Sequence, residues 1–371
     1  MKNFKTFLLL SFCFFSQSYS NAETHRHLNF FSEVFRYIRS ESVQPASDES
    51  LIENAVQGML SSLDDHSMYI TPAKYQEILN SLKGGFDGIG IEFTLMDGKV
   101  IIVSPIDDTP ASKAGLMAGD EILEIERDSI NGLLLPEIRD KIKGQVGEPL
   151  SLKIRRENEI LEFQLQRSKI NIKALKWSLS ENLLFIRISH FDEKIGSRLR
   201  DLLKKVRPKI KGVVLDLRNN PGGILEEALD ATNAFLSKGK IISVKTHHSK
   251  NDKTYYASPK KVILPSLPLV ILINGGTASS AEIVAAALKD HNRATLIGEK
   301  SFGKGSVQTI LPIPPGYAAI QLTTGLYYTP SGLSLDKQGI QPHLLEKDKN
   351  DSTSDSLKEK AVQILSEKIA L

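Results

Sequence analysis

The strongest constraint on the fold is an apolar run, from Leu267 to Asn274, that is followed by two glycines and a helix-forming stretch. An apolar run without alternation is typical of a strand buried on both faces of a mainly parallel sheet. The alanine-rich residues from Ala281 to Leu288 favour a helix. The sequence therefore predicts a strand, a turn and a helix, and it places Ser279 on the turn beside the helix N-terminus.

The hydroxyl of Ser279 has two interpretations. It can cap the helix, as Thr277 or Ser280 can, because Ser and Thr are among the preferred N-cap residues, and position alone favours this reading. It can also be a nucleophile, because unpaired backbone N–H groups and the helix dipole stabilise negative charge at such a place. Position therefore leaves capping and catalysis both open.

A nucleophilic serine needs a base, and none of the eight histidines stands in an obvious partner position. The loop after the next predicted strand presents Lys304 between two glycines, which allow close approach of other chain segments. A lysine acts as a base only when neutral, so its pKa must fall from about 10.4 to about 7 or 8, as burial in a dry cleft can achieve. Gln308 could orient the amine through its uncharged side-chain oxygen.

Two glycine-rich segments argue against a nucleotide site. Residues 298–305 read G-x-x-x-x-G-K-G, but a P-loop requires a hydroxyl for magnesium where this chain has Gly305. The segment RNNPGG, residues 218–223, follows a predicted strand and opens a helix, so its backbone N–H groups can form an anion-binding nest. It lacks the G-x-G-x-x-G motif of dinucleotide-binding proteins. His247 and His248 have no suitably spaced third ligand, so we expect no metal and no cofactor.

Three motifs in order, DLRNNPGG, NGGTASSAEI and GEKSFGKGSVQ, resemble the carboxyl-terminal processing peptidases, also called tail-specific proteases. The resemblance covers about residues 28 to 345. It implies an α/β fold with a ClpP/crotonase-like catalytic core, an N-terminal helical segment and an inserted PDZ domain. The chain is thus identified as similar to serine-type endopeptidases that cleave proteins near the C-terminus.

The resemblance also implies roles for individual residues. Ser279 and Lys304 would form a Ser/Lys dyad that Gln308 orients. The oxyanion hole would use the Ser280 amide and one glycine amide, and the sequence does not say which of two glycines donates. These candidates are Gly222 and Gly223. His66, in LDDHSMYI, would have a capping or packing role, since the family does not use it in chemistry.

Residues 84–168 change to short β runs broken by Gly and Asp, and they resemble a PDZ domain. Backbone N–H groups of the segment GIGI can hold a terminal carboxylate while the peptide adds as a strand, and nearby apolar side chains favour an apolar last residue. The expected binding residues are Gly88, Ile89, Gly90, Ile91 and Phe93. We therefore expect protein substrates with unstructured, apolar C-termini.

The remaining segments complete the predicted organisation. Residues 1–22 resemble a secretory signal peptide, with an apolar core too short to span a bilayer and the only cysteine, Cys13. We expect residues 23–83 to form an N-terminal helical segment and residues 169–346 to form the Ser/Lys peptidase core. Residues 347–371 are expected to form a linker and a C-terminal helix, which begins with a capping box from Ser356 to Glu359. We expect an exported protein, periplasmic or extracellular, and membrane-associated if the leader is retained.

A net charge of +3 gives no reason to expect nucleic acid as a partner. Two other functions stay open at this point: a catalytically silent, PDZ-containing peptide-binding scaffold, and a crotonase-like acyl-CoA enzyme on the same core. A regulatory adaptor and a homo-oligomer are also left open. The physiological substrate is not determined by the sequence.

Overall fold

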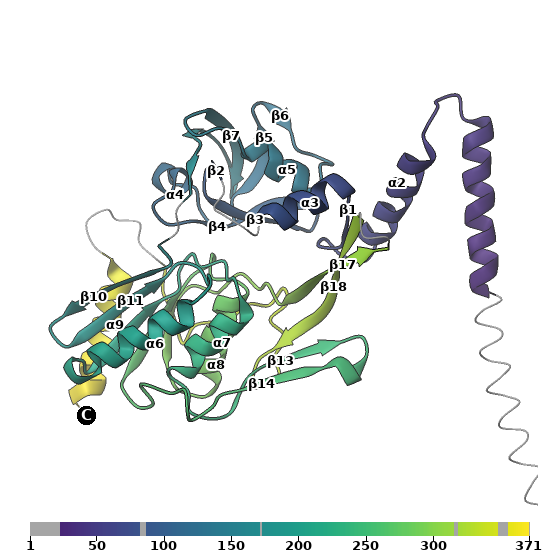
Figure 1. Ribbon diagram of the computed structural model, residues 1–371. Helices are drawn as coiled ribbons and strands as arrows, with labels where there is room; N and C mark the ends of the chain where they lie inside the picture. Colours follow the sequence, from purple (N-terminus) through teal and green to yellow (C-terminus); the bar gives the residue numbers. More distant parts are fainter. Residues whose placement is uncertain (1–22, 82–86, 171–172, 315–317, 348–354, 371) are drawn as a thin grey trace, which may run out of the picture. The chain divides into compact units, whose positions relative to one another are not determined.

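The computed structural model describes residues 23–81, 87–170, 173–314, 318–347 and 355–370 (Figure 1). The chain divides into two compact units, residues 1–63 and 64–371. The first unit contains a helix over residues 23–41 and α2 (Asp48–Ser61), whose N-cap Ser47 accepts a hydrogen bond from the Ser50 amide. Both helices were expected. The predicted signal peptide, residues 1–22, lies outside the described residues.

The PDZ segment is an antiparallel sheet with two helices packed on it. The strands follow the order β3 (Ile91–Met96), β4 (Lys99–Pro105), β5 (Glu121–Ile125), β7 (Pro149–Arg156) and β8 (Glu159–Gln166), and β6 (Asp128–Ser129) pairs with β5. The helices are α4 (Pro110–Ala114) and α5 (Leu135–Ile142), and a short pair, β2 (Asp87–Gly88) and β9 (Ser168–Lys169), closes the segment. A separate apolar cluster fills it, with Ile102, Ile138 and Leu150 fully buried.

The segment predicted to be the peptidase core is built on a six-stranded sheet. Its order is β10 (Leu175–Ser180), β11 (Leu183–Ile188), β12 (Gly212–Asp216), β15 (Leu269–Ile273), β16 (Thr295–Gly298) and β19 (Leu344–Leu345), and only the β10–β11 pair is antiparallel. All five residues of β15 are buried, as its uninterrupted apolar sequence predicts.

Helices cover both faces of this sheet (Figure 1). One face packs against α6 (Ile195–Val206), α7 (Leu225–Asn233) and α8 (Ser280–Asp290). The other face, including Val270 and Leu272, packs against α9 (Ser356–Ala370). The expected docking of the C-terminal helix is therefore observed. Its start differs from the capping box, because Asp355 accepts the Lys358 amide at 3.1 Å and so caps the helix in place of Ser356.

A second sheet lies beside the first. It has the order β1 (Met68–Ile70), β18 (Ala318–Tyr328), β13 (Lys240–Thr246) and β14 (Lys253–Tyr256), and β17 (Ser306–Ile313) pairs with β18. The segment 23–83, expected to be helical, thus also contributes the strand β1, followed by α3 (Pro72–Ser81). Short 3-10 turns, η1 (Arg207–Lys209) and η2 (Ser249–Asn251), complete the described elements.

Candidate active site

Ser279 occupies a strained turn between β15 and α8. Its backbone has φ 52° and ψ −120°, a region that non-glycine residues rarely adopt and that is often found at functional sites. The two other hydroxyls of the turn are bound to backbone carbonyls: Thr277 Oγ1 donates to Leu217 O at 2.8 Å, and Ser280 Oγ donates to Gly223 O at 2.8 Å. Thr277 and Ser280 therefore fix the turn, and Ser279 sits at its strained point.

The loop 218–223 packs directly against this turn. A Cβ at Gly222 would lie 2.8 Å from the Ser279 Cβ, and one at Gly223 would lie 2.3 Å from Phe191 O, so only glycine fits at either place. The Gly222 amide donates to Asn220 Oδ1 at 2.9 Å. Across the described ranges, no hydrogen bond uses the amide of Gly223 or Ser280. These two backbone donors are thus available to a ligand beside Ser279.

Glu282 joins the serine turn to the lysine loop. Its fully buried carboxylate accepts hydrogen bonds from the Ser279 amide (2.9 Å), the Ser301 hydroxyl (2.5 Å), the Gly303 amide (2.8 Å) and the Lys304 amide (2.9 Å). Burial raises the pKa of Glu282 to about 7, although the four donors act in the opposite direction. The sequence analysis did not single out Glu282, although its place three residues after Ser279 matches a capping box.

Lys304 lies on a tightly packed loop and is half-buried. A Cβ at Gly305 would lie 2.0 Å from Asp336 N, and Gly303 O accepts the Lys337 amide at 2.8 Å. The flanking glycines therefore allow residues 336–339 to approach the loop, as their sequence pattern predicts. This packing fixes the backbone from which the lysine side chain extends.

Gln308 is held by two hydroxyl groups on the second sheet. Its Nε2 donates to Ser306 Oγ at 2.8 Å and to Thr323 Oγ1 at 3.4 Å, across the β17–β18 pair. Among the described residues, no hydrogen bond joins Gln308 to Lys304. Its orienting role stays a prediction.

His66 lies close to Lys304, a proximity that the sequence analysis missed. Burial lowers the pKa of His66, and the positive charge of Lys304 lowers it further. The His66 ring nitrogen Nδ1 lies 3.5 Å from Thr94 Oγ1 on β3, and Asp64 accepts the His66 amide at 2.8 Å. His66 is therefore a packed neighbour of the site, placed by a turn that Asp64 closes.

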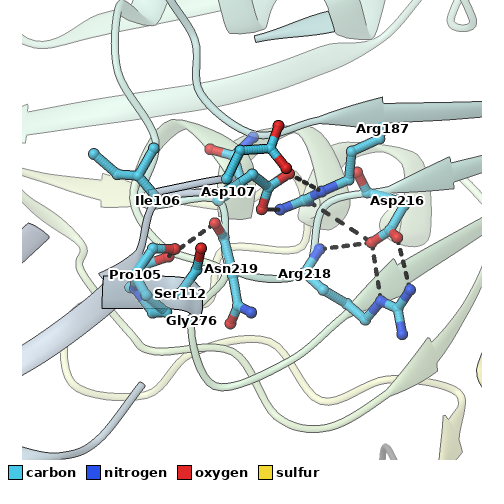
Figure 2. A network of polar contacts seen from close by, with 12 residues as sticks. Pro105, Ile106, Asp107, Ser112, Arg187, Asp216, Arg218, Asn219 and Gly276 are labelled. Carbon is cyan, nitrogen blue, oxygen red and sulfur yellow. Dashed lines mark hydrogen bonds and ion pairs between the residues drawn. The ribbon is translucent and has the colours of Figure 1, made fainter. Parts of the chain in front are cut away.

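A chain of charges connects the PDZ segment with the loop 218–223 (Figure 2). Arg187 contacts Asp107 at 2.9 Å and Asp216 at 3.8 Å, and Asp216 also binds Arg218 at 2.7 Å. Burial raises the pKa of Asp216, but the two guanidinium groups outweigh burial and hold that pKa below its usual range. Arg218 in turn binds Asp355 at the start of α9.

The predicted PDZ binding residues lie at one edge of their sheet. Gly90 adopts φ 81°, and its carbonyl accepts hydrogen bonds from the Ile106 amide and the Thr109 hydroxyl. β3 pairs only with β4 among the described strands, so its other edge is open to a peptide. The side chains of Ile89, Ile91 and Phe93 are buried in the domain, which leaves mainly their backbone for ligand contact. Gly88 pairs with Ser168 through β2 and β9.

Comparisons with known proteins agree with this geometry. The model of peptidase family S41 matches residues 182–345, and that of the PDZ domain matches residues 88–166. A carboxy-terminal-processing protease of Bartonella bacilliformis is 44% identical over 87% of this chain and 75% of its own length. The chain belongs to the carboxy-terminal-processing proteases of family S41.

Other members of the S41 family are also similar. The carboxy-terminal processing protease CtpA of Bacillus subtilis is 33% identical over 84% of this chain and 67% of its own length. The solved structure of a photosystem II D1 C-terminal processing protease superposes with a TM-score of 0.77 at 25% identity, covering 85% of this chain and 86% of the other. The chain is therefore a serine-type protease with a PDZ domain, and this membership decides against an acyl-CoA enzyme on the same core.

Two further observations concern the described residues only. They contain no group of three or more His, Cys, Asp or Glu side chains arranged to hold a metal ion. Among the helices described, none has both the length and the apolar character needed to cross a membrane.

Proposed function

We propose that this protease uses Ser279 as nucleophile and Lys304 as general base to cut protein substrates near their C-termini. The observation that carries the proposal is the buried Glu282 carboxylate, which binds the backbone amides of both residues at 2.9 Å. One rigid group therefore sets the position of the two segments that bear the hydroxyl and the amine. Such fixed positioning of reacting groups is a main source of catalytic rate.

The reaction follows from these groups. Lys304, in its neutral form, takes the Ser279 proton as Oγ attacks the scissile carbonyl carbon. The oxyanion accepts hydrogen bonds from the free amides of Gly223 and Ser280. When the intermediate collapses, the C–N bond breaks and the protonated Lys304 gives its proton to the leaving amine. Water then hydrolyses the acyl-enzyme, with Lys304 again acting as base.

The structure supports Gly223 over Gly222 as the glycine donor, because the Gly222 amide is already bonded to Asn220. Gln308 would act through its side-chain oxygen Oε1, since its Nε2 already donates to Ser306 and Thr323. That oxygen is the atom of Gln308 that can accept a hydrogen bond from the lysine amine. Gln308 is thus proposed as the residue that orients Lys304.

The PDZ domain is proposed to select substrates by their tails. A free C-terminal carboxylate would bind the backbone amides of residues 88–91, and the peptide would add along the open edge of β3. Holding the tail raises its effective concentration at Ser279. Substrates would therefore have unstructured C-termini, and the membership of residues 88–166 in the PDZ family supports an apolar last residue. The leader-like residues 1–22 support export, to the periplasm or the cell exterior.

The test compares proteins in cells that carry the wild-type protease with those that carry Ser279→Ala or Lys304→Ala. Mass spectrometry should find proteins shortened at the C-terminus only with the wild type, and each variant should lose essentially all turnover of an unstructured peptide. Ser331→Ala, an exposed loop substitution, is the matched control and should retain activity. Full activity in Lys304→Ala would disprove the dyad.

A further inference from the structure

The second sheet of the core carries a large groove that the proposed chemistry does not use. Its volume is about 1310 Å³, and it is lined by β13, β14, the turn between them, β17 and β18. Its apolar lining residues include Val244, Tyr255, Leu311, Leu322 and Leu326. The groove is thus wide enough for several residues of an extended chain.

The rim of the groove is basic. Lys245, Lys250 and Lys253 line it together with two histidines, and the three lysines are exposed. Over the described ranges, none of these lysines forms an ion pair, and Lys245 instead lies 4.5 Å above the Tyr328 ring. Among the described lining residues Asp252 alone is acidic, and it is bound to the Thr246 amide at 2.7 Å. With three lysines and one carboxylate, the described lining of the groove therefore carries a net positive charge.

Two lining residues of the groove lie close to segments of the proposed catalytic site. Leu225, which lines it, lies two residues after Gly223 on the proposed oxyanion loop. Thr323, also a lining residue, accepts a hydrogen bond from Gln308. None of the described lining residues belongs to the PDZ segment. One end of the groove therefore lies near the proposed oxyanion loop and Gln308, and the PDZ segment does not line it.

We propose that this groove binds an acidic segment of the substrate, immediately N-terminal to the scissile bond. An extended chain points alternate side chains to opposite sides, so apolar residues can contact the apolar lining residues while Asp or Glu reach the lysines. The segment precedes the cut because the C-terminus is assigned to the PDZ domain. The inference rests on the proposed proteolytic function and adds a substrate preference to it.

The experiment uses three unstructured peptides with the same apolar C-terminus. Mass spectrometry first maps the cleavage site. The four residues before it are acidic (Asp or Glu) in one peptide, Asn or Gln in the second and Lys in the third. The kcat/KM of the wild type should be about tenfold higher for the acidic than for the amide peptide, and lowest for lysine. Raising the ionic strength should reduce this preference, since exposed charges are screened by salt.

A charge reversal then tests the groove itself. The triple variant Lys245→Glu, Lys250→Glu and Lys253→Glu should prefer the lysine peptide. The matched control reverses Lys204, Lys205 and Lys209, which lie on α6 and η1 and do not line the groove, and it should keep the wild-type order. Both variants change the net charge equally, so a general charge effect would alter both alike.

Binding is measured separately with labelled peptides and the Ser279→Ala protein, which reports affinity without turnover. A wild type that cuts all three peptides equally would overturn the groove proposal and leave the protease function intact. So would a groove variant that keeps the acidic preference. Absence of Ser279-dependent cleavage of every peptide, with the acidic peptide still bound most tightly, would instead contradict the proposed function alone.

Discussion

Two buried carboxylates of the core, Glu282 and Asp216, have different environments. Glu282 is surrounded by uncharged donors, three amides and one hydroxyl, and burial raises its pKa to about 7. Asp216 is equally buried but lies between Arg187 and Arg218, and its pKa falls below the usual range. Burial outweighs four uncharged donors at Glu282, whereas at Asp216 two guanidinium groups outweigh burial through their charge and the hydrogen bonds of Arg218.

The two residues also have different structural consequences. Glu282 connects segments that carry the proposed nucleophile and base, so its protonation bears directly on the active site. Asp216 connects β12, the PDZ segment and, through Arg218, the C-terminal helix (Figure 2). We therefore expect substitutions of Asp216 to affect stability most, and those of Glu282 to affect stability and turnover together.

The largest expected effect on stability is that of Asp216→Asn. It removes the buried anion shared by two partly buried arginines, and breaking a buried ion pair typically costs about 3 to 5 kcal/mol. Urea denaturation should show this loss in the free energy of unfolding. A loss below about 1 kcal/mol would mean that the arginines find other partners, and the contrast with Glu282 would then fail.

Glu282→Gln should cost less stability, about 1 to 3 kcal/mol, because a side-chain amide donor replaces an oxygen among groups that are themselves donors. The kcat should fall more strongly than KM rises, since Ser279 and Lys304 lose their common anchor. Peptide kinetics and denaturation measure the two effects. Unchanged kcat in a folded Glu282→Gln protein would contradict the positioning role.

The pH dependence separates the two carboxylates. The pKa of Glu282 is raised, so its contribution to stability is complete below about pH 4.5 and is lost as pH rises through about 7, with an upper limit of about 3 kcal/mol. Asp216 has a lowered pKa, so its contribution is present above about pH 4 and is lost only in more acidic solution. Urea denaturation at pH 5 and at pH 8 measures this. The free energy of unfolding should change less between the two pH values for Glu282→Gln than for the wild type.

Activity should increase over the pH range in which the stabilising contribution of Glu282 decreases. Turnover should rise from neutral to alkaline pH, because the proposed base must be neutral, and it should resist metal chelators. A rate profile with and without EDTA measures this. Loss of activity to EDTA in protein that stays folded would indicate a metallopeptidase instead.

The smallest expected effect is that of Asp107→Asn at the PDZ end of the charge chain. Asp107 and Arg187 are only partly buried, so we expect a loss of about 1 kcal/mol or less. A double-mutant cycle with Arg187→Gln isolates the pair. A coupling free energy above about 2 kcal/mol would show that the Asp107–Arg187 ion pair is as strong as a buried pair, despite its partial exposure.

Much of the fold was predictable because local pattern and tertiary structure agree. The uninterrupted apolar sequence of β15 is buried on both faces, and the helix-forming residues after Ser279 form α8. The strand β1 was missed because three residues, Met68–Ile70, are too short for a periodic signal. Its pairing with β18 depends on a partner about 250 residues away, which no local pattern can reveal.

The sequence by itself determined the protease family, the PDZ segment and the candidates Ser279, Lys304 and Gln308, because motif order and turn chemistry are local properties. Only the tertiary structure decided that the Gly222 amide is occupied while that of Gly223 is not, and that Glu282 joins the segments of Ser279 and Lys304. It also decided that lysines of β13, β14 and the turn between them line one groove. The reason is physical. Hydrogen-bond satisfaction, burial and summed charge depend on which distant segments meet, and packing alone brings them together.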